Sequence, residues 1–250
     1  MKIIEDLISS IPESGKDTFV KEVRIGPFWT GVWSKYCGLA STTFIHEPNM
    51  PPPIKDAGSL TNKNIAELCN FAYSDCLLQA SVGIAAINSA IKIDLNQCHE
   101  INAAEVLFEK GEDKKVVVVV HFPFVKKLGK VAKKLWIVER RPQVGDIPAN
   151  EAARVIPEAD IVAITGTALI NRTMESLLTL CPKKSLVMIL GASTPLSSVW
   201  FDYGVDFISG TRVFNPELIL RMVSEGVTFK QVHGRGIKLL TIQKEKYNQS

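Results

Sequence analysis

The sequence has no long uninterrupted apolar segment, no paired cysteine motif and no large excess of charge. Its most apolar stretch, Leu77–Ile91, contains Gln and Asn and is too short to span a bilayer. The first ten residues include acidic side chains where a secretory signal needs an unbroken apolar core. The five cysteines are scattered without a C-x-x-C pair, which favours reduced thiols over a disulfide framework. We therefore expect a cytoplasmic protein with no membrane partner.

The glycine motifs of nucleotide-binding folds are also missing. A dinucleotide site needs G-x-G-x-x-G after the first strand of the fold, because only glycines let the pyrophosphate reach the helix N-terminus. The corresponding turn reads HFPFVKKLGK, which is bulky and contains proline. No G-x-x-x-x-G-K-[ST] motif occurs either. We expect no NAD, FAD or ATP cofactor.

Charge is nearly balanced, with a net value of +3, and only one segment is locally basic. Its lysines alternate with apolar residues at helical spacing: Lys126, Lys127, Lys130, Lys133 and Lys134, with Val125, Leu128 and Val131 between them. This pattern is typical of the solvated face of an amphipathic helix. No aromatic side chains lie among the lysines, so we expect no nucleic-acid partner.

At its centre the sequence contains a β-α-β unit. Ile161–Thr165 and Leu186–Leu190 are short apolar runs bounded by glycine and polar residues, as buried strands are. Between them, apolar residues from Leu169 to Cys181 follow helical spacing until Pro182 ends the segment. The crossover of such a unit is right-handed.

Strands and helices alternate strictly on both sides of this unit. The other predicted strands are apolar runs: Val116–Val120, Leu135–Val138, Asp206–Ser209 and Ile237–Ile242. The other predicted helices are Ala103–Lys110, the lysine-rich segment, a short one near Glu151–Val155, one from Thr194 and Pro195 to about Gly204, and one from Asn215 to Gly226. This order predicts an α/β fold with a Rossmann-like, doubly wound, mostly parallel sheet.

The first hundred residues have a different pattern. A helix over residues 3–11 precedes a strand in Thr18–Gly26 and two more in Phe28–Phe44, which predicts an antiparallel meander. The proline-rich segment Glu47–Pro53 is a stiff loop or flap. Helices at Ile65–Ser74 and Leu77–Ile91 follow, and the second is apolar nearly all round and therefore buried. We expect a small α+β domain over residues 1–100 and a Rossmann-like domain over 101–250, with a boundary near 95–112.

Three predicted strands end in small polar residues with a glycine, and such ends meet at one edge of a parallel sheet. The residues are Thr165, Gly166 and Thr167, then Gly191, Ser193 and Thr194, and finally Gly210. They are typical either of ordinary tight turns or of an edge where glycine lets a ligand approach the backbone. Asn171 and Thr194 stand at predicted helix starts, whose free N–H groups favour an anionic group.

His121 follows the valine strand and is expected at the same edge. It is either a metal ligand or proton-transfer group, or a structural histidine that hydrogen-bonds across a turn. Glu139 and Asp146 offer carboxylates nearby, and Glu139 is a second candidate metal ligand. Asn88 lies in the buried helix, so its amide needs a partner that is either neighbouring backbone or a ligand.

Seven segments form a recognisable set: GLAST (Gly38–Thr42), SVGIAAINSA (Ser81–Ala90), HFPF (His121–Phe124), an E-R-x-P-x-x-G-D-x-P run (Glu139–Pro148), ITGTALINRT (Ile164–Thr173), LGASTPL (Leu190–Leu196) and ISG (Ile208–Gly210). Together they resemble a bacterial and archaeal family described as "putative heavy-metal chelation". Members of that family often carry glycine where this chain has Val120.

The resemblance implies that a small enolase-N-terminal-like domain precedes the Rossmann-like domain. It also implies an interdomain cleft lined by these motifs, with Thr42 among the ligand-binding residues, and a homodimer. A divalent heavy metal or a metal chelate is the ligand that the resemblance implies.

Three functions are compatible with these residues. The first is a binding protein for a small molecule, a metal or a metal chelate, acting in heavy-metal homeostasis. The second is an enzyme that acts on a small polar or anionic metabolite with His121 as acid and base. The third is an oligomeric scaffold whose cleft has no ligand.

We predict that the protein binds neither NAD nor FAD, because the HFPF turn blocks the position of the pyrophosphate. Isothermal titration calorimetry with each dinucleotide should therefore give no heat of binding. Micromolar affinity for either one would contradict this interpretation of the turn.

Overall fold

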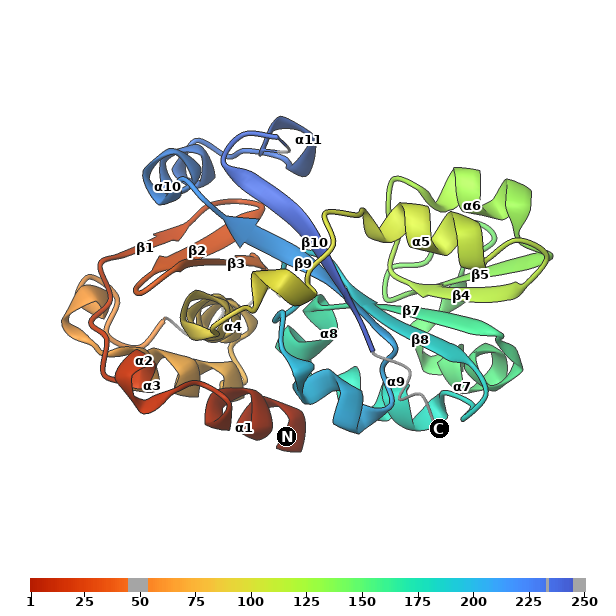
Figure 1. Ribbon diagram of the computed structural model, residues 1–250, viewed down its shortest axis with the longest axis horizontal. Helices are drawn as coiled ribbons and strands as arrows, with labels where there is room; N and C mark the ends of the chain where they lie inside the picture. The colour runs from red at the N-terminus through yellow and green to blue at the C-terminus, as the bar shows by residue number, and fades with distance from the viewer. Residues whose placement is uncertain (45–53, 233, 245–250) are drawn as a thin grey trace.

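A computed structural model describes residues 1–44, 54–232 and 234–244. It contains a seven-stranded sheet, parallel except at one edge, and a three-stranded antiparallel sheet (Figure 1). The predicted fold class, a doubly wound sheet preceded by a small α+β region, is confirmed. The proline-rich segment Glu47–Pro53 lies outside the described residues.

The N-terminal region places one long helix against its small sheet. Its elements are α1 (Lys2–Ser9), α2 (Glu13–Lys16), β1 (Glu22–Ile25), β2 (Trp29–Trp33), β3 (Cys37–Ser41), the 3-10 turn η1 (Leu60–Asn62), α3 (Ile65–Cys69), η2 (Asn70–Tyr73) and α4 (Leu77–Ala90). The strands pair in the order β1-β2-β3 as the predicted meander. Gly38 permits the close contact with α4, because a Cβ there would lie 2.2 Å from the carbonyl oxygen of Ala85.

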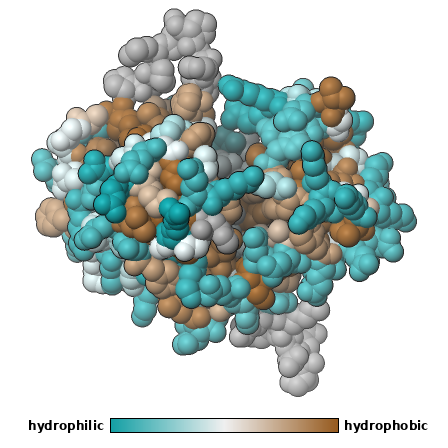
Figure 2. Space-filling view, turned by 90° about the horizontal axis from the view of Figure 1, so that it is seen from above, coloured by the Kyte–Doolittle hydropathy of each residue, from teal (hydrophilic) through white to brown (hydrophobic). Residues whose placement is uncertain are grey.

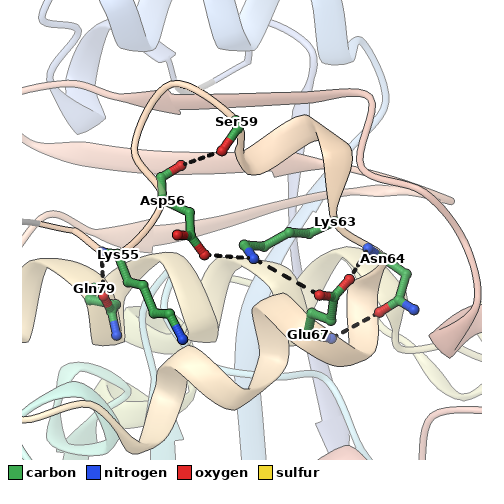
Figure 3. A network of polar contacts seen from close by, with 7 residues as sticks. All are labelled: Lys55, Asp56, Ser59, Lys63, Asn64, Glu67 and Gln79. Atoms are coloured by element: carbon green, nitrogen blue, oxygen red, sulfur yellow. Dashed lines mark hydrogen bonds and ion pairs between the residues drawn. The ribbon is translucent and has the colours of Figure 1, made fainter.

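A polar network fixes the start of α3 (Figure 3). The side chain of Asn64 accepts a hydrogen bond from the backbone N–H of Glu67, and the Glu67 carboxylate accepts one from the N–H of Asn64. Lys63 forms an ion pair with Asp56 at 2.8 Å. The hydrogen bond to Lys63 lowers the pKa of Asp56. The reciprocal Asn64–Glu67 contacts form a capping box, which satisfies two N–H groups that a helix end would otherwise leave free.

The large sheet has the strand order β10-β9-β8-β7-β4-β5-β6. Its strands are β4 (Lys115–Val119), β5 (Lys134–Glu139), β6 (Ile147–Pro148), β7 (Ile161–Thr165), β8 (Leu186–Leu190), β9 (Phe207–Val213) and β10 (Ile237–Gln243). Among the described strands of this sheet, β10 alone is antiparallel to its neighbour. After β4, the strands β5 and β6 are added on one side of it, and β7, β8 and β9 are then added on the other side. The strand order therefore reverses beside β4, which is where open α/β sheets form a ligand crevice.

Helices cover both faces of this sheet (Figure 1). On one face lie α5 (Ala103–Lys110) and α6 (Val125–Val131); on the other lie α7 (Ala152–Val155), α8 (Thr167–Ile170) and α9 (Met174–Leu180). The valines of β4 serve both faces in alternation, as strand geometry requires. Val116 and Val118 join the apolar cluster under α5 and α6, while Val117 and Val119 join the opposite cluster.

The remaining elements are short turns and the C-terminal helices. They are the 3-10 turns η3 (Leu95–Gln97), η4 (Ala149–Glu151), η5 (Ile156–Glu158) and η6 (Ser198–Tyr203), and the helices α10 (Pro216–Ser224) and α11 (Phe229–Val232). Helix α10 packs on β1 and β2, so the C-terminal part of the chain covers the small sheet. Among the described helices, none has both the length and the apolar character needed to cross a bilayer.

One apolar cluster joins α1, α3 and α4 to the large sheet. Polar contacts across great sequence distance reinforce it. The backbone N–H of Ile3 donates to the Glu175 carboxylate at 3.0 Å, and the Tyr203 hydroxyl donates to Asp6 at 2.5 Å. Burial and the Asp6 carboxylate both raise the pKa of Tyr203. The first helix is thus held by residues about two hundred positions later in the chain.

Several predicted helices differ in the structure. The predicted helix Ile65–Ser74 is α-helical only to Cys69 and continues as η2. The segment from Leu169 to Cys181 is two helices, α8 and α9, because Arg172 takes a left-handed backbone with φ +62° and Asn171 accepts hydrogen bonds from Thr173. Asn171 therefore ends a helix and does not start one. Thr194 is no helix start either: its N–H donates to the Gly191 carbonyl, and η6 begins only after Ser197, whose hydroxyl caps it.

The lysine-rich helix ends earlier than predicted, at Val131. Lys134 already belongs to β5, and its ammonium lies 4.6 Å from the centre of the Trp136 ring. The two-residue strand β6 was not predicted, because Ile147–Pro148 is too short to show alternation. The valine strand ends at Val119, one residue earlier than predicted.

Asn64→Ala should lower the free energy of unfolding by about 1 kcal/mol, because it removes the side-chain cap of α3. Asn150→Ala is the matched control, since the Asn150 side chain is exposed and has no hydrogen bond within the described residues. Urea unfolding should leave the control within a few tenths of a kcal/mol of the parent. Equal losses in both variants would contradict the role of the capping box.

Candidate functional site

A cavity of about 320 Å³ lies at the carboxyl ends of β7 and β8 and beside the middle of β9, and we name it the strand-end cavity. The third predicted strand does not end before Gly210, because β9 continues to Val213. Its walls come from the N-terminal region, from the turns before α5 and α6, and from the C-terminal part of the chain. The lining residues are Trp29, Ser41, Ile101, Asn102, Ala103, Ala104, Phe122, Pro123, Phe124, Thr165, Thr167, Leu190, Gly191, Ala192, Ser193, Ser209, Gly210, Thr211, Phe229, Leu239 and Leu240.

Aromatic rings form opposite parts of the wall. Phe122 and Phe124 stack with ring centres 5.2 Å apart, and Trp29 lies 6.4 Å from Phe229 in a tilted pair. Figure 2 looks down on this side of the molecule and shows a hollow between two largely hydrophilic rims, with hydrophobic atoms inside it. Rings of this kind offer flat apolar surface to an organic ligand.

Hydroxyl groups line the sheet side of the cavity, and most are tied to one another. Thr165 and Thr167 share a hydrogen bond of 3.0 Å. The Ser193 hydroxyl accepts a 2.8 Å bond from the backbone N–H of Ser41, which joins β3 of the small sheet to the end of β8. Ser209 is bonded to Thr241 at 2.6 Å. These bonds hold each hydroxyl in a fixed position without using all of its hydrogen-bonding capacity.

Three glycines beneath the cavity let backbone segments pack closely together. Gly191 has φ +105°, a left-handed conformation that suits glycine. A Cβ on Gly166 would lie 2.6 Å from the backbone nitrogen of Thr194, and one on Gly210 would lie 2.8 Å from the Thr194 carbonyl oxygen. Backbone therefore packs directly on backbone beneath the cavity.

Among the described residues that line the cavity, none has a side chain that is ionisable at neutral pH. A buried charge needs a partner of opposite sign, and an unpaired ion costs several kcal/mol in such surroundings. A lining of this kind favours an uncharged group over an ion.

A second group, which we name the His121 cluster, consists of His121 just after β4, Glu139 at the end of β5 and Asp146 just before β6. The Nε2 atom of His121 lies 2.8 and 2.9 Å from the two Asp146 oxygens. Glu139 accepts the backbone N–H of His121 at 3.2 Å. None of the three lines the strand-end cavity, although Phe122, the next residue after His121, does.

Val120, the residue before His121, has an unusual backbone conformation. Its φ is +80°, a left-handed value that is rare for a β-branched residue. The family resemblance predicts glycine at this position, and the backbone there has the geometry that glycine adopts without strain. Such strain persists only where surrounding contacts enforce it, and here the N–H of Val120 donates to the Val138 carbonyl.

The structure thus divides the predicted site residues into two groups and leaves some outside both. Thr165, Thr167, Gly191, Ser193 and Gly210 line the cavity, with Gly166 packed beneath it. The amide of Asn88 donates to the Leu39 carbonyl at 2.8 Å, so backbone is its partner.

Three other predicted site residues also lie outside the cavity lining. Thr42 is bonded to Thr30 at 2.9 Å. Asn171 is bonded to Thr173, beyond the end of α8. Thr194 is 2% exposed, and its hydroxyl has no hydrogen-bond partner in the described part of the chain.

Several cavity residues were missed from the sequence, above all Trp29 and Phe229. They lie two hundred positions apart, and nothing local in the sequence indicates that they share a wall. The phenylalanines of the HFPF segment were predicted to block a dinucleotide and were not predicted to form the wall of a cavity. The indole N–H of Trp29 is buried without a hydrogen-bond partner among the described residues.

The described residues contain no group of three or more His, Cys, Asp or Glu side chains placed to hold a metal ion. The cysteines do not change this. All five have free thiols, and burial raises the pKa of Cys37, Cys69 and Cys181 to about 12. These three stay protonated at neutral pH, and a thiol binds a metal as the thiolate.

Comparison with known proteins gives consistent matches over nearly the whole chain. A family model described as "Putative heavy-metal chelation" (DUF364) matches residues 102–241, and a second with the same description (DUF4213) matches residues 4–91. An uncharacterized protein of Methanocaldococcus jannaschii is 28% identical over 179 residues, which cover 68% of this chain and 69% of that protein.

Two crystal structures are similar in fold. A protein with unknown function from the DUF364 family of Desulfitobacterium hafniense has a TM-score of 0.81 and 25% identity, covering 97% of this chain and 98% of its own. Another DUF364 protein with unknown function, from Pyrococcus horikoshii, has a TM-score of 0.78 and 18% identity with the same coverage.

Val120→Gly should change the free energy of unfolding by less than about 1 kcal/mol, because relief of the left-handed strain offsets the lost valine contacts. Val119→Gly is the matched control, since Val119 is 8% exposed in a regular strand. It should cost roughly 2–4 kcal/mol. Urea unfolding compares the two, and equal losses would show that the conformation of Val120 carries no strain.

Proposed function

The chain belongs to the family described as "Putative heavy-metal chelation", and from that premise we propose that it binds a small organic metal-chelating molecule, or the metal complex of one, in the strand-end cavity. The observation that supports this most is the combination of aromatic walls and fixed hydroxyls with no ionisable side chain. Such a lining suits an uncharged ring-bearing molecule and disfavours a bare cation.

The donor atoms of the chain support a chelate over a free metal ion. Zinc at a structural site takes four protein ligands, and at a catalytic site three. Within the described ranges no such group of side chains is assembled. A molecule that already holds its metal needs only a fitting surface and a few hydrogen bonds, which the cavity supplies.

A second candidate function is an enzyme with His121 as acid and base. The observation in its favour is the Asp146 carboxylate on Nε2, because a carboxylate on one ring nitrogen fixes the tautomer and leaves the other nitrogen to exchange a proton. Incubation with a metabolite extract followed by mass spectrometry separates the two functions. Loss of one metabolite and appearance of a product would favour the enzyme.

The proposal includes the oligomeric state and the cellular location that the sequence predicts. We expect a homodimer that acts in the cytoplasm, with residues 1–100 and 101–250 as its two domains and an interdomain position for the ligand. The N-terminal contribution to the cavity comes from Trp29 and Ser41.

We expect 1,10-phenanthroline, an uncharged planar chelator, to raise the melting temperature of the protein. A ligand at one hundred times its Kd stabilises a protein by about 2.7 kcal/mol, and each kcal/mol corresponds to roughly 2–4 °C for a chain of this size. Thr211→Trp, which fills the cavity, should remove the shift. Lys130→Ala, on the exposed face of α6, should retain it.

Thermal-shift assays on untagged protein measure these shifts, with Zn²⁺ and Ni²⁺ salts tested in parallel. Stabilisation by the free metal ions alone would contradict the proposed ligand class. A shift that survives Thr211→Trp in a folded protein would mean that the ligand binds elsewhere.

A further inference from the structure

His121 has one ring nitrogen engaged and one available. Its Nε2 faces both oxygens of Asp146, whose side chain is only 5% exposed. Its Nδ1 has no hydrogen-bond partner in the part of the chain that the structure describes. The His121 side chain is 32% exposed, so a dissolved molecule can reach it. A neutral imidazole that donates from Nε2 carries a free lone pair on Nδ1.

The two carboxylates around His121 are already committed to holding it. One oxygen of Glu139 accepts the N–H of His121 and the other accepts the N–H of Arg140 at 2.8 Å. Asp146 also accepts the N–H of Gln143 at 2.8 Å. Together with the strained backbone of Val120, these contacts fix both the main chain and the ring of His121. The carboxylates therefore position the histidine.

An imidazole held in this way is in the usual state of a metal-binding histidine, which donates its other N–H to a carboxylate or carbonyl. Imidazole nitrogen suits zinc, copper, iron and nickel. The chain thus offers one well-oriented nitrogen ligand. It does not offer, among its described residues, the further ligands that a free ion needs.

We propose that His121 Nδ1 provides a single ligand to a metal whose other ligands come from a bound chelating molecule, with Asp146 and Glu139 as positioning residues. This inference rests on the proposed function and names how the protein recognises the metal-loaded form. A chelate with a vacant coordination position gains the bond to His121. A chelate that fills every position gains nothing from it.

The test uses the Cu²⁺ complex of iminodiacetate, a tridentate chelator that leaves positions vacant, and the saturated Cu²⁺–EDTA complex as its control. The protein is untagged and carries His46→Gln, His99→Gln and His233→Gln, so that His121 is its only histidine. Electron paramagnetic resonance detects nitrogen bound to copper, and the visible copper band measures affinity.

We expect the iminodiacetate complex to show one bound imidazole nitrogen and a shifted visible band, and the EDTA complex to show neither. His121→Gln in the same background should remove the signal. Asp146→Asn should weaken binding about 10–100-fold, the usual cost of losing the outer partner of a metal-binding histidine. Asp202→Asn, an exposed aspartate on η6, is the matched control and should leave the affinity unchanged.

Absence of a nitrogen signal in the protein whose only histidine is His121 would overturn the inference. An affinity unchanged by Asp146→Asn, in a protein with native circular dichroism, would overturn the positioning role. These outcomes are distinct from failure of the proposed function, which is the absence of stabilisation by the uncharged chelator. If that chelator stabilises the protein but no nitrogen is bound to copper, the proposed ligand class of the cavity is retained and the role of His121 as a metal ligand is rejected.

Discussion

The arrangement depends on β4, a strand whose valines are buried from both sides. Val116, Val117 and Val118 have no exposed surface, and each face of the strand belongs to a different apolar cluster. Because β4 pairs with β5 on one side and with β7 on the other, the strands that follow it in sequence are added on opposite sides of it. The connections that follow the two sets of strands then diverge, and this divergence alone forms a crevice between them.

The strand-end cavity and the His121 cluster lie on opposite sides of this crevice. Small residues at the ends of β7 and β8 and in the middle of β9 build the apolar cavity, whereas the ionisable residues of the His121 cluster follow β4, end β5 and precede β6. Separation keeps charges out of the cavity, where they would be costly to bury. The HFPF turn connects the two, since His121 belongs to one group and Phe122 to the other.

The sequence was informative wherever a property is local or periodic. Five consecutive valines predicted a strand buried on both faces. The glycines after β7, β8 and within β9 predicted room for a ligand, whereas at Gly166 and Gly210 the backbone of Thr194 occupies that room. The break between α8 and α9 could not be predicted in the same way, because it depends on side-chain hydrogen bonds of Asn171 and on the left-handed Arg172. The pairing of Trp29 with Phe229 arises only when distant segments meet, whereas a carboxylate of Asp146 near His121 was expected from the sequence.

The anchoring of α1 has a consequence for the time course of folding. Ile3 and Asp6 bond to Glu175 and Tyr203, so the first helix finds its polar partners only after some two hundred residues have been synthesised. At 5–20 residues per second, a ribosome takes roughly ten to forty seconds to reach that point. Throughout that interval the apolar face of α1 (Ile3, Ile4 and Leu7) lacks part of its final packing. The packing of α1 is therefore completed only after Glu175 and Tyr203 have been synthesised, which places the burial of its apolar face late in folding.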